Sequence, residues 1–139
     1  MNRVEKTVEI DQPVDVVYAA WSRFEDFPAF LEGVSAVERQ SDGRLRWTSK
    51  DGTTVEVEVT EQVPDEVVAW RTVGDTTDSW RASLIALSLR RTRVDLEVEH
   101  EPHGIVERAA DALGVLERRV EGDLARFKAH VGGTSGHDS

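Results

Sequence analysis

Cysteine is absent from the 139-residue chain, and methionine occurs once. Without cysteine the chain can form no disulfide framework, no thiolate zinc site, no iron–sulfur cluster and no thiol nucleophile. Long apolar runs are also missing, since no stretch approaches the roughly 20 apolar residues that a membrane helix needs. The N-terminus lacks the apolar core of a signal peptide. We therefore expect no integral membrane segment and a cytoplasmic location.

Basic side chains are scarce, with 17 Lys and Arg against 27 Asp and Glu and a formal net charge of −10. Phosphate contacts need a basic face, so a nucleic-acid partner is not expected. The acidic residues are spread along the chain, which is typical of a solubilising surface. The hydrophobic fraction of 39% fits a folded globule. What remains is a small domain that handles neutral or apolar molecules, or another protein.

The first part of the chain predicts one strand followed by two short helices. Residues 3–10 alternate apolar and polar side chains, which is the pattern of a half-buried strand. Asp11 is a suitable N-cap, and Pro13 suits the start of a helix, where a missing N–H costs nothing. A second short helical segment is predicted over residues 24–33, FEDFPAFLEG, with Pro28 in its first turn.

From Val34 onward the pattern changes to that of an antiparallel β-meander. Turn signals occur at Ser41-Asp42-Gly43, at Asp51-Gly52 and at Pro64-Asp65. Six further strands are predicted at residues 34–40, 44–50, 53–63, 66–73, 77–88 and 92–101. With the first strand they make about seven.

The C-terminal part predicts one long amphipathic helix. Apolar residues from Ile105 to Val131 recur at steps of three and four, which gives about 27 residues and a rod of roughly 40 Å. Residues 132–139, GGTSGHDS, predict a disordered tail, so the domain is expected to span residues 1–131. A single helix cannot fill the concave face of a strongly curved sheet. We therefore expect an apolar space between them, which is a usual place for a small-molecule site.

Three segments resemble bacterial polyketide cyclase/dehydrase-like proteins of the START-like (SRPBCC, Bet v 1-like) superfamily: IDQPVDVVYAAWSRFEDFPAFLEGVSAVER, EQVPDEVVAWR and EPHGIVERAADALGVLERRVEGDLARFK. The resemblance covers roughly residues 3–131. It implies an α+β helix-grip fold, in which a curved seven-stranded antiparallel sheet wraps around a long C-terminal helix and two short helices follow strand 1. The superfamily includes cyclases, lipid and quinone carriers and hormone receptors, so it implies a hydrophobic ligand without naming one.

The same resemblance assigns several site residues. The cavity-lining aromatic of aromatase/cyclases falls on Phe27, their cavity tyrosine falls on Val34, and their arginine before the V-P-D turn falls on Gln62. A second cavity arginine corresponds to Arg71. Aldol cyclisation needs proton transfer and stabilisation of developing enolates, and a glutamine supplies only a neutral amide. The loss of tyrosine and arginine argues against cyclase activity, a lyase reaction, so whether the chain is an enzyme stays open.

The strand around Val57 can face the cavity in either of two phases. Burial of Val55, Val57 and Val59 leaves the intervening glutamates in solvent and is favoured, because burying unpaired glutamates is costly. The resemblance implies the opposite phase, which would make Glu58 a candidate base with a raised pKa. A shift of one residue in the pairing register of this strand would exchange the side chains that face the cavity with those that face solvent.

Aromatic and apolar side chains supply the candidate ligand contacts, and three polar residues supply the catalytic candidates. The ligand-binding candidates are Phe27, Phe30, Val34, Trp47, Gln62, Trp70, Trp80, Leu113, Leu116 and Val120. The catalytic candidates are Arg71, Glu58 and His100. The alternatives are structural: the aromatic residues would build the core, Arg71 would pair with a neighbouring acid on the surface, and His100 would be a hydrogen-bonded core histidine.

Cofactor motifs are lacking. The sequence has no P-loop, no G-x-G-x-x-G and no G-x-S-x-G. His100 and His103 lie near two glutamates in the sequence. The Pro102 and Gly104 break does not fix the two imidazoles relative to each other, and no third histidine is near, so we expect no metal and no cofactor. The favoured function is binding of a polyketide-like aromatic, quinone or lipid by a monomer or homodimer. The alternatives are a polyketide cyclase/dehydrase and a protein-interaction or chaperone-like domain.

Overall fold

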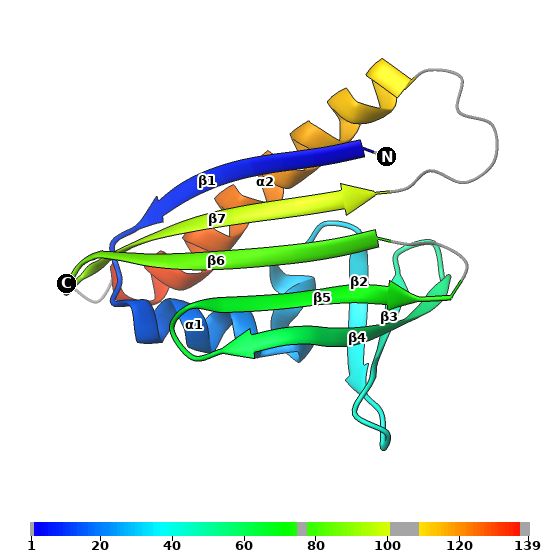
Figure 1. The fold of residues 1–139 in the computed structure, drawn as a ribbon, viewed down its shortest axis with the longest axis horizontal. Coiled ribbons are helices and arrows are strands. Elements are labelled where there is room, and N and C mark those ends of the chain that lie inside the picture. Colours follow the sequence, from blue (N-terminus) through cyan, green and yellow to red (C-terminus); the bar gives the residue numbers. More distant parts are fainter. Residues whose placement is uncertain (1, 75–77, 101–108, 137–139) are drawn as a thin grey trace.

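A single antiparallel sheet and one long helix dominate the computed structural model, which describes residues 2–74, 78–100 and 109–136 (Figure 1). The strands lie in the order β1-β7-β6-β5-β4-β3-β2. Their bounds are β1 (Asn2–Ile10), β2 (Val34–Arg39), β3 (Leu45–Ser49), β4 (Thr54–Val63), β5 (Val67–Val73), β6 (Asp78–Ser88) and β7 (Arg91–His100). The helices are α1 (Val14–Ser22), the 3-10 helix η1 (Phe24–Ala29) and α2 (Ala109–Gly136). The predicted fold class and the order of its elements are confirmed.

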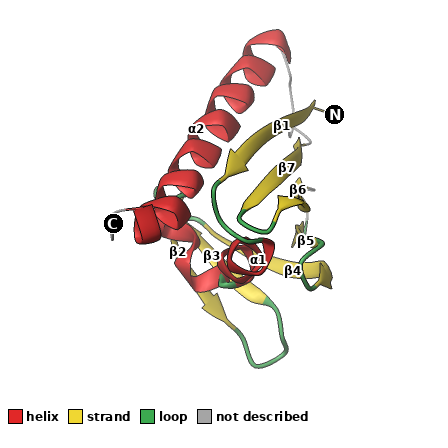
Figure 2. Ribbon diagram, turned by 90° about the vertical axis from the view of Figure 1, so that its left-hand side faces the viewer, coloured by secondary structure: helices red, strands yellow, loops and turns green. Residues whose placement is uncertain are grey.

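Every strand pairs with its neighbour in the chain except β1, which crosses to the far edge and pairs with β7. The alternation in β7 explains which face is buried. Val94, Leu96 and Val98 are at most 3% exposed, and the residues between them point to the other face. The buried row faces α2, which lies across the concave side of the sheet along β1 (Figures 1 and 2).

Helix α1 begins without the predicted aspartate cap. Pro13 occupies the N-cap position and no side chain caps the helix, so the prediction for Asp11 is wrong. Asp11 lies two residues before Pro13, and the Gln12 amide donates a hydrogen bond to the Ile10 oxygen. This local turn separates Asp11 from the first turn of α1. A carboxylate still meets the helix N-terminus, since Asp15 accepts a hydrogen bond from the Val16 amide.

Helix α2 continues to Gly136, past the predicted end at Val131. The helix thus includes residues 132–136, which the sequence assigned to the tail, whereas residues 137–139 lie outside the described residues. Once a helix is nucleated, each further residue adds a backbone hydrogen bond at small cost, which allows this extension despite its glycines. The predicted start at residue 105 also lies outside the described residues.

Aromatic side chains build the centre of the core where α1, η1 and α2 meet the sheet. Trp21 of α1 stacks on Phe127 of α2 with ring centroids 4.2 Å apart. Phe27 lies 5.1 Å from Trp70 of β5, and Phe30 lies 4.9 Å from Phe127. All five rings are at most 1% exposed. Aromatic packing thus closes this end of the space between sheet and helix.

Candidate functional site

A cavity of about 190 Å³ opens on the concave side of the sheet beside α2. Its walls come from the segment between η1 and β2, from the inner faces of β3 to β6, and from one face of α2. The described lining residues are Leu31, Gly33, Val34, Trp47, Ser49, Val55, Thr72, Asp78, Trp80, Arg119 and Asp123. The sheet side of the cavity therefore combines apolar side chains with the polar Ser49, Thr72 and Asp78, and α2 borders it with charged side chains.

Two indole rings form the aromatic part of this wall. The Trp47 and Trp80 centroids lie 5.2 Å apart, and Trp80 stacks on buried Trp70 at 6.1 Å with an interplanar angle of 11°. Antiparallel register explains the stack, because Trp70 and Trp80 face each other directly across β5 and β6. Val34, Trp47 and Trp80 are thus sequence candidates that the structure places on the cavity wall.

Other aromatic candidates lie beneath the cavity and not on its wall. Phe27, Phe30 and Trp70 pack against each other and against Trp21, so their expected exposure to a ligand is corrected. The physical reason is that η1 folds its aromatic residues inward as part of the hydrophobic core. This filling also explains why the cavity is smaller than the 300–1,000 Å³ of a drug-sized site.

Strand β4 turns Val55, Val57 and Val59 toward the core and places its first glutamates on the convex face. Val57 is fully buried, which confirms the favoured phase, and Glu58 lies opposite Arg71 in the β4–β5 register. Arg71 Nε donates a 2.7 Å hydrogen bond to Glu58 Oε2, and both side chains are partly exposed. The phase implied by the resemblance, with Glu58 and Arg71 at the cavity, is therefore not the one observed, because the sheet separates this ion pair from the cavity.

A β-bulge then changes the phase of β4. The register shifts between Val59 and Glu61, so that Glu61 reaches the convex face and pairs with Arg81, while Gln62 comes to lie opposite Val68. Gln62 is exposed at the end of the strand and does not line the cavity. Its expected place on the wall is therefore corrected as well.

The remaining candidates lie on α2 and at the end of β7. Val120 is buried in the core and Leu116 packs against it partly exposed, so α2 uses both as core residues outside the described cavity wall. The side chain of Leu113 lies outside the described residues. The same holds for the side chain of His100, whose backbone pairs in register with Asn2 and with Asp78 of the cavity wall.

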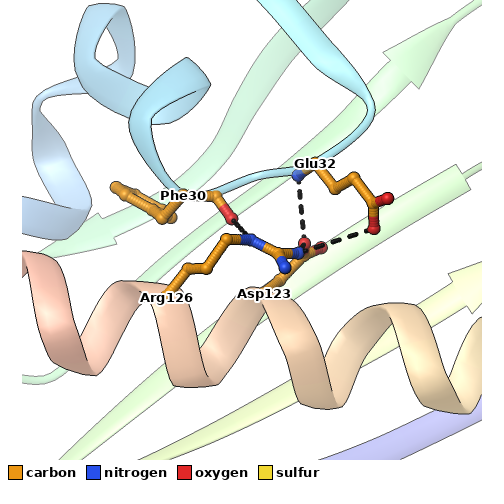
Figure 3. A network of polar contacts seen from close by, with 4 residues as sticks. All are labelled: Phe30, Glu32, Asp123 and Arg126. Atoms are coloured by element: carbon orange, nitrogen blue, oxygen red, sulfur yellow. Dashed lines mark hydrogen bonds and ion pairs between the residues drawn. The ribbon is translucent and has the colours of Figure 1, made fainter.

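A polar network joins α2 to the segment that follows η1 (Figure 3). Asp123 accepts a 3.0 Å hydrogen bond from the Glu32 amide and an ion-paired hydrogen bond from Arg126. Arg126 Nε also donates to the Phe30 oxygen at 2.9 Å, and its Nη2 lies 3.7 Å from Glu32 Oε1. These contacts hold Leu31 and its neighbours in place at the edge of the cavity.

Burial raises the pKa of the Asp123 carboxyl above its ordinary value. The Glu32 amide, Arg126 and Arg119 act in the opposite direction by favouring the charged form, but burial is the larger effect. Asp123 is 9% exposed and belongs to the cavity wall. It is therefore a cavity-wall carboxyl whose charged form is opposed by burial and favoured by Arg126 and the Glu32 amide.

Sequence reasoning missed the polar residues of α2. Asp123 follows Val120 by three residues and precedes Phe127 by four, so it lies on the apolar face of the helix. Arg119 follows Leu116 by three and precedes Asp123 by four. A charged residue three or four positions from the apolar residues of a helix lies on or beside its apolar face. This sequence signal would have identified Arg119 and Asp123 as candidate site residues.

Three indole N–H groups in the core have no hydrogen-bond partner among the described residues, those of Trp21, Trp47 and Trp70. An unsatisfied buried donor costs about 1–3 kcal/mol. Trp47 also belongs to the cavity wall. The indole ring of Trp47 therefore borders the cavity while its N–H group is buried.

Among the described residues, no group of three or more histidine, cysteine, aspartate or glutamate side chains is placed to hold a metal ion. Among the helices of the same residues, none is long and apolar enough to cross a membrane.

Comparison with known proteins places the fold in a defined class. A START superfamily protein from Mycobacterium smegmatis superposes with a TM-score of 0.74 at 19% identity, covering 94% of this chain and 97% of that one. An aromatase/cyclase from Streptomyces superposes with a TM-score of 0.73 at 18% identity, covering 94% and 93%. At these identities the likeness shows the fold alone. The chain has the START-like helix-grip architecture.

The family follows from sequence. The family model described as polyketide cyclase / dehydrase and lipid transport matches residues 10–129. An uncharacterized 17.2 kDa protein from Streptomyces lincolnensis is 38% identical over 137 residues, covering 94% of this chain and 90% of that protein. The chain belongs to the polyketide cyclase/dehydrase and lipid transport family.

Proposed function

We propose that the protein binds a hydrophobic small molecule with a single ring in the cavity between the sheet and α2. The observation that carries this proposal is the cavity of about 190 Å³ with two indoles in its wall. A dry apolar cavity of about 150 Å³ accepts benzene, so a substituted ring fits the volume available here. Flat indole walls favour a flat ring through stacking.

The cavity volume narrows the ligand classes that the family allows. Polyketide-like aromatics, quinones and lipids were all expected from the sequence. A long acyl chain needs more room than about 190 Å³, whereas a small aromatic or a quinone ring does not. The proposed ligand is therefore a substituted ring, with any chain extending through the opening.

Two measurements test this function. Native mass spectrometry of the freshly purified protein is expected to show a bound small molecule. In an NMR titration, ethylbenzene is expected to shift the indole N–H resonances of Trp47 and Trp80 more than that of Trp21, which lies away from the cavity wall. No bound molecule together with no shift at Trp47 or Trp80 would contradict the proposal and leave a protein-interaction or chaperone-like role.

A polyketide cyclase/dehydrase is the second candidate, and Asp123 is the observation that favours it. Aldol cyclisation needs a group that moves protons next to the substrate, and Asp123 is a cavity-wall carboxyl whose pKa is raised by burial. Arg71 and Glu58, the residues first expected in that role, lie on the other side of the sheet. His100 stays a candidate through its register with Asp78.

Heptane-2,4,6-trione is a suitable probe of this second function. Attack of its terminal methyl carbon on the distant carbonyl forms one C–C bond, and loss of one water then gives a dihydroxytoluene with a single ring. The wild-type protein should form this product faster than buffer alone, and Asp123→Asn should remove the acceleration. Equal rates with wild type and without protein would exclude cyclase activity on this substrate class.

A further inference from the structure

We infer that the ligand carries an anionic oxygen, as a carboxylate or an ionised enol, and that Arg119 binds it at the opening of the cavity. This inference rests on the proposed function and adds the polar half of the ligand. It assigns to Arg119 the role of a specificity residue, separate from the aromatic wall that would receive the ring.

Arg119 is the only basic residue among the described residues that line the cavity. It comes from α2, one helical turn before Asp123, and its side chain is exposed at the rim. Its guanidinium lies beside Gly33, where a Cβ atom would make an ordinary contact of 3.8 Å with Arg119 Nη1. Gly33 and Arg119 therefore border the same part of the cavity.

The guanidinium of Arg119 has no ion-pair or hydrogen-bond partner within the part of the chain that the structure describes. Eight other arginines form ion pairs: Arg3, Arg39, Arg44, Arg71, Arg81, Arg91, Arg93 and Arg126. In a chain with a net charge of −10, acidic partners are abundant. An arginine at a cavity that makes no direct hydrogen bond or ion pair with any described acidic group is therefore placed to bind something else.

The acidic groups of the wall make no direct hydrogen bond or ion pair with this guanidinium among the described residues. Asp123 bonds to Arg126 and to the Glu32 amide, and Arg119 acts on it only as a nearby charge. Asp78 is engaged as well, and its own amide donates to the Thr72 hydroxyl at 3.0 Å. The donors of Arg119 thus stay available at the opening, and its positive charge favours an anion over a cation.

Guanidinium chemistry fits the oxygen proposed. The planar fork of arginine donates two parallel hydrogen bonds to a carboxylate, and it remains charged at any physiological pH. Its long side chain can follow a ligand at the rim while its apolar stem covers the ring. An amphipathic ring with one acidic substituent therefore matches both halves of the site.

The test compares three probes of similar size, ethylbenzene, 4-ethylbenzamide and 4-ethylbenzoate, by NMR titration of the wild-type protein at pH 7. The carboxylate is expected to bind about tenfold more tightly than the amide, since hydrogen bonds to charged groups are the stronger class. Added salt should weaken binding of the benzoate and leave that of the amide unchanged.

Variants of α2 locate the effect. Arg119→Gln is expected to remove the preference for the benzoate while preserving affinity for ethylbenzene, and Arg119→Lys should keep part of the preference. Arg118→Gln is the matched control, because Arg118 is an adjacent exposed arginine that does not line the cavity. It should behave as wild type.

Each result separates the two proposals. Equal affinity for benzoate and benzamide, or a preference that survives in Arg119→Gln, overturns the inference about Arg119 and leaves ring binding standing. Absence of binding by all three probes in the wild-type protein overturns both the ring-binding function and the inference.

Discussion

Trp21 and Phe127 stack with their ring centroids 4.2 Å apart and an angle of 27° between the ring planes. The first comes from α1 and the second from α2, so this contact fixes the two helices against each other over the sheet. Next to it, Arg126 bonds the Phe30 oxygen and fixes η1 to the same helix. The position of α2, and with it the cavity opening, depends on these two adjacent residues.

Removal of the Phe127 ring should be among the most destabilising changes in the chain. Phe127 is fully buried, and truncation of a buried phenylalanine to alanine costs about 3–5 kcal/mol through lost burial and a residual cavity. We expect Phe127→Ala to lower the free energy of unfolding by that amount in urea denaturation. Lys128→Ala, at the adjacent exposed position, is the control and should change it by less than about 0.5 kcal/mol. Similar losses for both variants would contradict the packing described.

The Asp123 carboxyl should make stability depend on pH in a defined direction. Because its folded-state pKa is raised, the folded protein holds this proton more tightly than the unfolded chain does. The resulting stabilisation is fully present below the ordinary pKa of 3.8 and is lost as the pH rises through the raised value. Relative to Asp123→Asn, which cannot titrate, the wild-type protein should therefore gain stability as the pH falls from 7 toward 4.

Urea denaturation of both proteins at several pH values measures this difference. Asp123→Ala is a useful third variant, because it removes the acceptor of the Glu32 amide and should cost about 1–3 kcal/mol more than Asp123→Asn at pH 7. A difference between wild type and Asp123→Asn that stays constant with pH would show that the carboxyl does not titrate as described.

Partial filling of the cavity should block the ring without disturbing the fold. Val55 lines the cavity, whereas Val63, on the same strand, is exposed beyond the bulge. Val55→Phe should lower the affinity for ethylbenzene about tenfold or more by occupying its space. The control Val63→Phe should bind as wild type does. Both affinities follow from the same NMR titration, with thermal unfolding as a check on the fold, and unchanged affinity in Val55→Phe would place the ligand elsewhere.

The ion pair between Arg71 and Glu58 should matter little to stability or to binding. Both side chains are partly exposed on the convex face, and such pairs contribute about 0–1 kcal/mol. We expect Arg71→Gln and Glu58→Gln to change the free energy of unfolding by no more than that and to leave ethylbenzene affinity unchanged. A large loss of affinity in either variant, with the fold intact, would return these residues to the site.

Local patterns in the sequence were sufficient for the elements and for much of the core. Alternation in β7 identified the buried row of Val94, Leu96 and Val98, because the side-chain period of a strand is two. Apolar residues at steps of three and four along α2 identified Val120, Leu124 and Phe127 as core residues, because such steps place side chains on one face of a helix. The strand bounds agree with the predicted ones to within one or two residues.

The site was predicted less well, because its residues come from segments that are distant in the sequence. The favoured alternation in β4 placed Gln62 in solvent, where the structure has it, whereas the bulge depends on pairing with β5 and no local pattern indicated it. The inward fold of η1 put Phe27 and Phe30 into the core, and that choice depends on Trp21 and Phe127.

The sequence by itself determined that the chain forms a curved antiparallel sheet with one long amphipathic helix, since periodicity and turn chemistry are local properties. Only the tertiary structure decided how much of the space between them stays open and which polar groups border it. Aromatic packing among α1, η1 and α2 reduced that space to a cavity of about 190 Å³. The docking of α2 onto the segment before β2 then brought Arg119 and Asp123 to its edge, since the position of a charge depends on the contacts of the whole helix.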